Sequence, residues 1–352
     1  MSVPLLYPWF ILGGGSFVLF TALLSGSFPA FYLSSIQPSQ ALKGAFRASR
    51  FSTLPRKVLV GLQFTISITL IIGTLIVYQQ IEFAKARPVG YSQEGLIMMR
   101  ITAQEYGDKY EVLRNEVLNT GMVSGMSGAK APVTDNQNHQ NGFGWKGKDP
   151  AFDPVFANFH ISSEYGRTIG WDVISGRDFS QDMSSDTSGV VINESALALM
   201  DLENPVGEVI TWDKRGENYR ILGVVKDMVR YSPYEPSLPS FFFLSNDLPW
   251  IHLRINPEVS VNEALPKIRA AFNEVIPSAP FNYTFVDDVY AEKFKKEERI
   301  GILAGFFAGL AIFISCLGLF GLASFVIVQR AKEIAIRKVL GASIINLWRL
   351  LS

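Results

Sequence analysis

The feature that most constrains this chain is an uncharged, mostly apolar segment, residues 300–328, which runs directly into a basic segment, residues 329–342. A helix needs ~20 apolar residues to cross the hydrocarbon core of a bilayer, and the first segment meets that length. Lys and Arg are enriched on the cytoplasmic side of membrane helices. The two segments therefore predict a membrane span that leads into a charged cytoplasmic helix.

Two further segments, residues 9–33 and 58–81, also carry no charged side chain. Residues 1–10 contain no Lys or Arg, whereas a signal peptide begins with a basic region and has a shorter apolar core. A buried core helix can also be apolar on all sides. Three such segments in one chain favour membrane insertion over that alternative.

The charges are distributed unevenly, although the chain has 32 basic and 32 acidic residues and no net charge. Residues 37–57 and 329–352 contain one acid, Glu333, against these basic residues: Lys43, Arg47, Arg50, Arg56, Lys57, Arg330, Lys332, Arg337, Lys338 and Arg349. Short basic loops stay in the cytoplasm during insertion. The first span then enters the cell, the second leaves it and the third returns. Residues 82–298, which we name the outer domain, are therefore expected outside the cytoplasm.

The outer domain is predicted to be a soluble α+β fold, large enough to bury a core of its own. Short apolar runs predict strands at residues 95–101, 189–193, 219–226, 240–244, 251–255 and 282–286, and helical spacing predicts helices at 106–118 and 261–275. These elements flank a β-rich middle, which indicates an insertion at about residues 169–248. The predicted fold class is a membrane protein of three transmembrane helices, with the α+β domain between the second and the third.

Sequence signatures of catalysis are missing. Neither a G-x-x-x-x-G-K-[ST] phosphate loop nor a G-x-S-x-G nucleophile elbow is present. His139, His160 and His252 stand far apart, without the spacing of zinc ligands. The single cysteine, Cys316, falls in the third span, so the outer domain folds without disulfides. We therefore expect no catalytic, cofactor-binding or metal site and no enzymatic activity.

Small residues recur every four positions along the second and third spans. They are Gly61, Thr65, Thr69 and Gly73 in the second span and Gly301, Gly305 and Gly309 in the third. This spacing lets helix backbones approach closely in lipid, although glycine is also simply common in membrane helices. We expect these faces to pack the second span against the third.

The basic segment is predicted to be a helix that docks on a partner. Glu333 and Arg337 have the spacing of an i,i+4 ion pair. The apolar residues spread around most of the circumference, whereas a helix lying on a membrane surface separates its faces. A helix held between lipid and a protein need not separate them. The alternative is that the segment only anchors the topology through its positive charge.

Several parts of the chain resemble the permease subunits of the MacB/FtsX-like class of ABC transporters. The segment RAKEIAIRKVLGA, residues 330–342, is similar to the family's signature after the span that follows its extracytoplasmic domain. The other similar segments are residues 26–34, Pro38 and residues 41–44 at the end of a repeat's last span, and residues 190–194, 204–207 and 221–227 in the outer domain. The order of span, outer domain, span and basic helix is also the family's.

The resemblance implies that the chain is a permease subunit that couples ATP hydrolysis by a separate cytoplasmic ABC ATPase to movement of the outer domain. The implied contacts with the ATPase are Arg330, Lys332, Glu333, Arg337, Lys338 and Gly341. We further expect an inner-membrane location, contact with lipid, and a second permease copy or a periplasmic adaptor as a partner. Export of a peptide or an antimicrobial is a candidate function. No nucleic-acid partner is expected.

Family members have four spans per unit, and the long form has two units, so we expect the chain to be part of a double form. The expected organisation is residues 1–36, the last span of a first unit; 37–57, a basic cytoplasmic linker; 58–81, a span; 82–298, the outer domain; 299–328, a span; and 329–352, a truncated coupling helix. Two alternatives stay open, a membrane-anchored sensor of an extracytoplasmic partner and an enzyme displayed outside the membrane.

Overall fold

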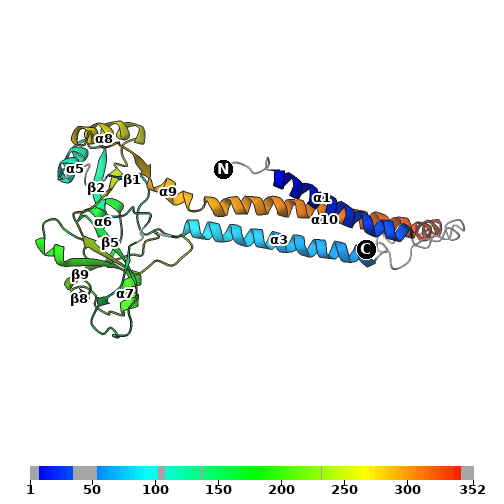
Figure 1. Cartoon of the computed structure of the whole chain (residues 1–352), viewed down its shortest axis with the longest axis horizontal. Helices are drawn as coiled ribbons and strands as arrows, with labels where there is room; N and C mark the ends of the chain where they lie inside the picture. Colours follow the sequence, from blue (N-terminus) through cyan, green and yellow to red (C-terminus); the bar gives the residue numbers. More distant parts are fainter. Residues whose placement is uncertain (1–7, 35–53, 102–107, 136–137, 231, 342–352) are drawn as a thin grey trace. The chain divides into compact units, whose positions relative to one another are not determined.

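The computed structural model describes residues 8–34, 54–101, 108–135, 138–230 and 232–341. The chain divides into two compact units: Leu70–Phe307, and a smaller unit of Met1–Thr69 with Ala308–Ser352. The larger unit contains the outer domain and the adjoining ends of two long helices (Figure 1).

The long helices are α1 (Pro8–Ser34), α3 (Leu54–Ala86) and α10 (Lys295–Val339). By length and composition, Lys57–Ala86 within α3 and Lys295–Val328 within α10 are able to cross a membrane. The apolar part of α1, Ile11–Ser27, is shorter. Two of the predicted spans are thus helices of sufficient length, and the three-span topology stays a prediction.

The outer domain is built on one twelve-stranded sheet of order β12-β1-β11-β2-β5-β10-β7-β9-β8-β4, with β3 beside β5 and β6 beside β9. The strands are β1 (Leu96–Arg100), β2 (Val123–Ala129), β3 (His139–Gln140), β4 (Phe143–Gly144), β5 (Phe156–Ile161), β6 (Val173–Gly176), β7 (Gly189–Asn193), β8 (Val209–Trp212), β9 (Glu217–Val225), β10 (Ser240–Leu244), β11 (Trp250–Ile255) and β12 (Tyr283–Phe285). The shorter helices are α5 (Tyr110–Asn119), α6 (Tyr165–Ile169), α7 (Glu194–Met200), α8 (Val261–Val275) and α9 (Val286–Glu292), with a 3₁₀ helix, η3, at Ser184–Ser188.

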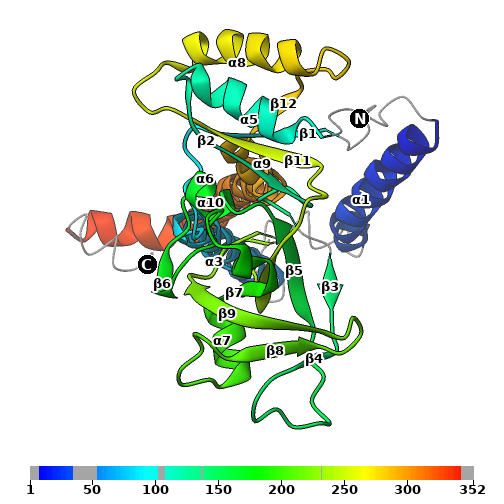
Figure 2. The same ribbon diagram turned by 90° about the vertical axis from the view of Figure 1, so that its left-hand side faces the viewer.

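The first half of the sheet, β12-β1-β11-β2, is antiparallel and packs against α5 and α8 (Figure 2). The apolar stripe of α8 recurs every three or four residues and is buried, as the helical period requires: Ala264, Ile268, Phe272 and Val275. The Ser260 side chain caps α8 by accepting a hydrogen bond from the backbone N–H of Glu263 at 3.3 Å. Local sequence and packing therefore agree on this helix.

The second half contains β5, β10, β7, β9, β8 and β4, with α7 packed against it. Its core is aromatic: Phe143, Phe156, Phe241, Phe243 and Trp212 contact one another with ring centroids 4.2–6.5 Å apart. Between β2 of the first half and β5 of the second, one residue pair, Ala129 with Ile161, continues the ladder. The two halves of the sheet are thus joined by a narrow connection.

Most of the elements predicted from the sequence are confirmed. The predicted strands correspond to β1, β7, β9, β10, β11 and β12, and the predicted helices to α5 and α8. Helix α5 begins at Tyr110, after the non-helical residues 108–109, and residues 106–107 of the predicted helix lie outside the described residues. The second half of the sheet includes β4 and β5, which precede the predicted insertion at 169–248. The domain boundaries stay a prediction.

The ring of His252, in β11, lies fully buried in the core, where its Nε2 accepts a hydrogen bond from the backbone N–H of Val133 at 3.1 Å. Burial, and to a smaller degree the charge of Arg230, lowers the pKa of His252 to about 3. The unfolded chain binds this proton near pH 6.5, whereas the folded chain excludes it until about pH 3. The stability conferred by neutral His252 is present above pH 6.5 and is lost as the pH falls through this window.

We therefore expect the His252→Gln variant to lose less stability than the unmodified chain between pH 6.5 and pH 5, by about 1.5 kcal/mol. Urea unfolding at each pH measures the difference. His139→Gln is the matched control because that side chain is exposed. An identical pH dependence in the His252 variant and the unmodified chain would contradict this prediction.

Candidate functional site at the junction of α3, α9 and α10

Helices α3 and α10 join the outer domain at a small apolar cluster of the larger unit. The cluster consists of Ile81 and Ala84 from α3, Val229 after β9, Tyr290 from α9 and Phe294 before α10. Each is less than a tenth exposed, and the Tyr290 and Phe294 rings lie edge to face at 5.4 Å. The cluster, named the junction, therefore ties the end of α3 to the start of α10.

Polar contacts surround the junction. Lys85 at the end of α3 forms an ion pair with Glu298 at the start of α10, with Nζ and Oε1 2.6 Å apart. Both side chains are about 40% exposed, so the pair contributes little stability. Lys293, just before α10, donates hydrogen bonds to the backbone carbonyls of Thr134 and Arg230. Burial lowers the pKa of Lys293.

Arg230 extends from the junction into the core of the outer domain. Its guanidinium is buried 3.8 Å from the Phe159 ring, and Nη2 donates to Tyr165 Oη at 3.1 Å. Burial raises the pKa of Tyr165, so the phenol stays neutral and accepts this hydrogen bond. The junction is thus continuous with the hydrophobic core that contains Phe159 and Tyr165.

A second arginine, Arg254 on β11, fixes the segment through which the chain passes from α3 into the sheet. Its guanidinium donates to the carbonyls of Ser92, Glu94, Thr168 and Ile169, at 2.8, 2.5, 3.0 and 2.9 Å respectively, and to Ser92 Oγ at 3.2 Å. The planar fork of Arg suits such convergent acceptors. The segment after α3, helix α6 and β11 are therefore held by one side chain. No motif marks Arg254 in the sequence, because its partners are mostly backbone carbonyls.

In the smaller unit, α3 and α10 contact each other through two buried serines. Ser67 Oγ and Ser315 Oγ share a hydrogen bond of 2.8 Å, and Ser67 Oγ also lies 3.2 Å from the Ala311 carbonyl oxygen, to which it can donate. Gly318 lies against α3, since a Cβ there would stand 2.7 Å from Gln63 Oε1. Interhelical hydrogen bonds of this kind average ~0.6 kcal/mol in membranes.

The predicted small-residue faces are not the ones that meet in this chain. At Gly61, Gly73, Gly305 and Gly309 an added Cβ would have nothing within 4 Å, and at Gly301 only Ile81 Cδ1 lies that close, at 3.9 Å. The hydroxyls of Thr65 and Thr69 bond to carbonyls of their own helix. The contact between α3 and α10 is instead made at neighbouring positions. A packing role for the predicted faces against other helices stays a prediction.

The Gly318→Leu variant should weaken the pairing of α3 with α10, because its side chain must displace Gln63. Gly309→Leu should leave the pairing unchanged, since the space beside Gly309 is open. Thermal unfolding in detergent should show a lower midpoint for the first variant only. Equal midpoints for the two variants would contradict the contact described above.

The residues predicted to contact an ATPase lie at and just after the end of α10, which continues from its candidate span, Lys295–Val328, to Val339 without a break. Arg330, Arg337 and Lys338 are exposed, and the side chains of Lys332 and Glu333 lie outside the described part of the chain. Gly341 has φ +88° and donates its N–H to the Lys338 carbonyl at 3.2 Å. This left-handed conformation ends the helix and favours glycine.

No group of His, Cys, Asp or Glu side chains that could hold a metal ion occurs within the described residues. Nor does the junction resemble a catalytic site, because its buried residues are mostly apolar and its charged groups bond to carbonyls or to each other. The arrangement is suited to holding helices and sheet together.

Comparison with known proteins identifies the family. The model of the MacB-like periplasmic core domain matches residues 60–271. Among solved structures, the periplasmic region of MacB from Actinobacillus actinomycetemcomitans is similar at 15% identity, with a TM-score of 0.40, covering 58% of this chain and 94% of that one. The extracellular domain of the noncanonic ABC-type transporter YknZ from Gram-positive bacteria is similar at 14% identity, with a TM-score of 0.37, covering 54% and 97%. No curated protein matches the chain. Because the family match spans more than half of the sequence, the chain belongs to the MacB/FtsX-like permeases of ABC transporters, with a MacB-like periplasmic core domain flanked by two helices able to cross a membrane.

Proposed function

We propose that this permease passes movement from a cytoplasmic ABC ATPase to its outer domain. In this mechanism closure of the ATPase displaces the basic end of α10, and α10 and α3 carry the displacement through the membrane. The junction then moves the outer domain. The chain itself performs no chemistry on ATP.

The observation that carries this proposal is the continuity of α10. One helix, Lys295–Val339, begins beside the junction and ends in the basic residues expected to meet the ATPase. A helix without a proline or another break keeps its ladder of i to i−4 hydrogen bonds and resists bending. A displacement at Lys338 can therefore reach Glu298 without being absorbed by an intervening loop.

The contacts of α3 and α10 support the same mechanism. The ion pair of Lys85 with Glu298 and the hydrogen bond of Ser67 with Ser315 connect the two helices in the larger and the smaller unit, respectively. A connected pair moves together more readily than two independent helices. The exposed apolar faces of α3 and α10 fit lipid or further helices, including those of a second permease copy.

The proposal requires the outer domain and the basic end of α10 to lie on opposite sides of an inner membrane. In a Cys316→Ala background, a cysteine at the exposed Ser185 should react with an impermeant maleimide in intact cells. A cysteine at the exposed Lys338 should react only after permeabilisation. The physical reason is that ATP is cytoplasmic and that basic segments are retained there. Labelling with the opposite sidedness would overturn the proposed function.

A further inference from the structure

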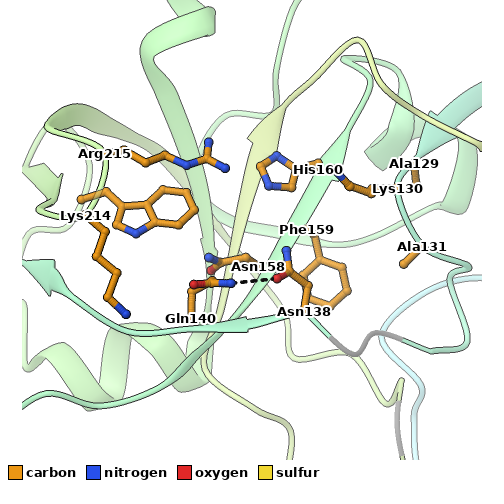
Figure 3. Close-up of a pocket in the computed structure, with 11 residues that line it drawn as sticks. Ala129, Lys130, Ala131, Asn138, Gln140, Asn158, Phe159, His160, Lys214 and Arg215 are labelled. Atoms are coloured by element: carbon orange, nitrogen blue, oxygen red, sulfur yellow. Dashed lines mark hydrogen bonds between the residues drawn. The ribbon is translucent and has the colours of Figure 1, made fainter.

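The outer domain contains a cleft of about 600 Å³ in which residues from distant parts of the sequence converge (Figure 3). The lining comes from β2 and the residues after it, from β3 and the residue before it, from β5, and from β8 and the turn that follows it. The cleft lies at the narrow connection between the halves of the sheet, because Ala129 belongs both to the lining and to the single β2–β5 pair. Its volume falls in the ~300–1,000 Å³ range of ligand pockets.

Three cations line the cleft, and no carboxylate does. Lys130 lies 3.5 Å from Asp247, and Arg215 lies 3.8 Å from Glu217, in pairs that are about half exposed or more. Such pairs are weak and exchange readily with a bound anion. The Nζ of Lys214 donates to an uncharged partner, the amide oxygen of Asn141. Lys214 therefore adds positive charge without a bonded acid.

Amide side chains occupy the space between the cations. In Figure 3 the side chains of Asn138, Gln140 and Asn158 gather together, with Lys214 and Arg215 on one side and Lys130 on the other. Gln140 Nε2 donates to Asn138 Oδ1 at 3.2 Å. Each amide carries both a donor and an acceptor, which is the pattern that a peptide backbone presents.

The remaining lining residues supply apolar surface and one neutral imidazole. Burial, followed by the charges of Arg215 and Lys130, lowers the pKa of His160 to about 4, so the ring is uncharged near pH 7. The Arg215 guanidinium lies 4.1 Å from the Trp212 ring centroid, which holds it in place through a cation–π contact. The cationic group is thus positioned before any ligand arrives.

Strand β3, which is two residues long, lies at an edge of the sheet beside this cleft. Strand β3 pairs with β5, and within the described part of the chain no other strand pairs with it. An extended peptide can add to such an edge through backbone hydrogen bonds, while pockets select its side chains. A small anion has no backbone that could pair with a strand, so the edge favours a peptide over a small anion as the ligand.

We propose that the cleft binds an acidic peptide segment, with its backbone at the β3 edge and amides and its carboxylates at Lys130, Lys214 and Arg215. The proposal concerns recognition by the outer domain and does not depend on coupling to an ATPase. It names the charge of the bound peptide and the site that binds it, neither of which the family resemblance gives.

The test uses the full chain in lipid nanodiscs and three labelled peptides that alternate alanine with glutamate, glutamine or lysine. Fluorescence anisotropy should show the glutamate peptide binding at least about tenfold more tightly than the other two, because only it pairs with the cations. Its affinity should fall as the salt concentration rises. Equal affinities for the three peptides, or no binding of the glutamate peptide, would overturn the proposal.

Charge reversal gives the sharper result. The Lys214→Glu and Arg215→Glu double variant should lose about tenfold or more in affinity for the glutamate peptide and gain affinity for the lysine peptide. Lys146→Glu is the matched control, because Lys146 is 82% exposed and lies outside the lining. A gain for the lysine peptide also shows that the double variant is folded. If the double variant still prefers the glutamate peptide to the lysine peptide, the cleft is not the binding site. If inorganic phosphate competes more strongly than unlabelled glutamate peptide, the ligand is a small anion and not a peptide.

Discussion

The Arg254→Ala variant should lose about 2–4 kcal/mol of the free energy of unfolding of the outer domain. Truncation removes the shared donor of four carbonyls. Those of Thr168 and Ile169 are partly buried, and those of Ser92 and Glu94 are exposed. The Ile169 carbonyl still accepts from the Ser92 N–H at 2.9 Å. Each unpaired buried acceptor costs roughly 1–3 kcal/mol, and part of this is recovered where water can enter. Arg254→Lys should lose about half as much, because one ammonium cannot replace the planar fork.

Urea unfolding of the full chain, followed by pulse proteolysis, measures this loss. Lys267→Ala is the matched control, since it removes only an exposed i,i+4 pair with Glu263, 2.8 Å long, and should change stability by less than ~0.5 kcal/mol. If the Arg254 and Lys267 variants unfold alike, then Arg254 does not fix the segment after α3. A displacement of α3 would in that case be absorbed before it reached the sheet.

The elements that sequence analysis predicted correctly are those with continuous apolar runs. Strand β7 (Gly189–Asn193) and strand β10 (Ser240–Leu244) were predicted at their observed bounds, because Val, Ile and Phe fill both faces of a buried strand. Helix α8 (Val261–Val275) was equally clear from its period. In these elements the apolar residues that form the sequence pattern are also the residues that are buried in the structure.

Two of the missed strands, β2 and β5, are mostly buried but contain small and polar residues. Strand β2 (Val123–Ala129) needs glycine because a Cβ at Gly128 would stand 2.8 Å from Leu248 Cδ1, and one at Gly125 would stand 3.1 Å from Thr168 Oγ1. Where residues distant in the sequence pack closely against the strand, glycine takes the place of the apolar residues by which a strand is predicted. A single sequence does not reveal which neighbours approach.

The candidate sites were missed for the same reason, because they depend on contacts between residues far apart in the sequence. Small residues every four positions mark several faces of a membrane helix, and the pattern does not say which face meets which helix. The buried serines, Ser67 and Ser315, mark the contact between α3 and α10 better, because hydroxyl groups in apolar helices form hydrogen bonds with a neighbouring helix. The basic cleft and the two arginines, Arg230 and Arg254, are assembled from separate strands and loops, so no motif marks them.

The Gly341→Leu variant should lose at least about fivefold in stimulation of the partner ATPase. Gly341 ends α10 at φ +88°, and a side chain in that conformation costs roughly 1–2 kcal/mol, enough to displace the helix end from its docked geometry. Gly341→Asn is the matched control, because asparagine tolerates left-handed backbone. It should keep stimulation within about twofold of the unmodified chain.

The measurement that tests the coupling mechanism most directly is ATP hydrolysis by the co-purified ATPase, assayed with the permease in nanodiscs. Glu333→Lys belongs in the same assay, since it keeps the segment basic but inverts one charge at the expected interface and should weaken ATPase binding by about tenfold. Coupling through α10 predicts that Gly341→Leu and Glu333→Lys insert normally yet stimulate poorly, while Gly341→Asn stimulates well. Full stimulation by both Gly341→Leu and Glu333→Lys would contradict it and would leave the basic segment only a topology anchor.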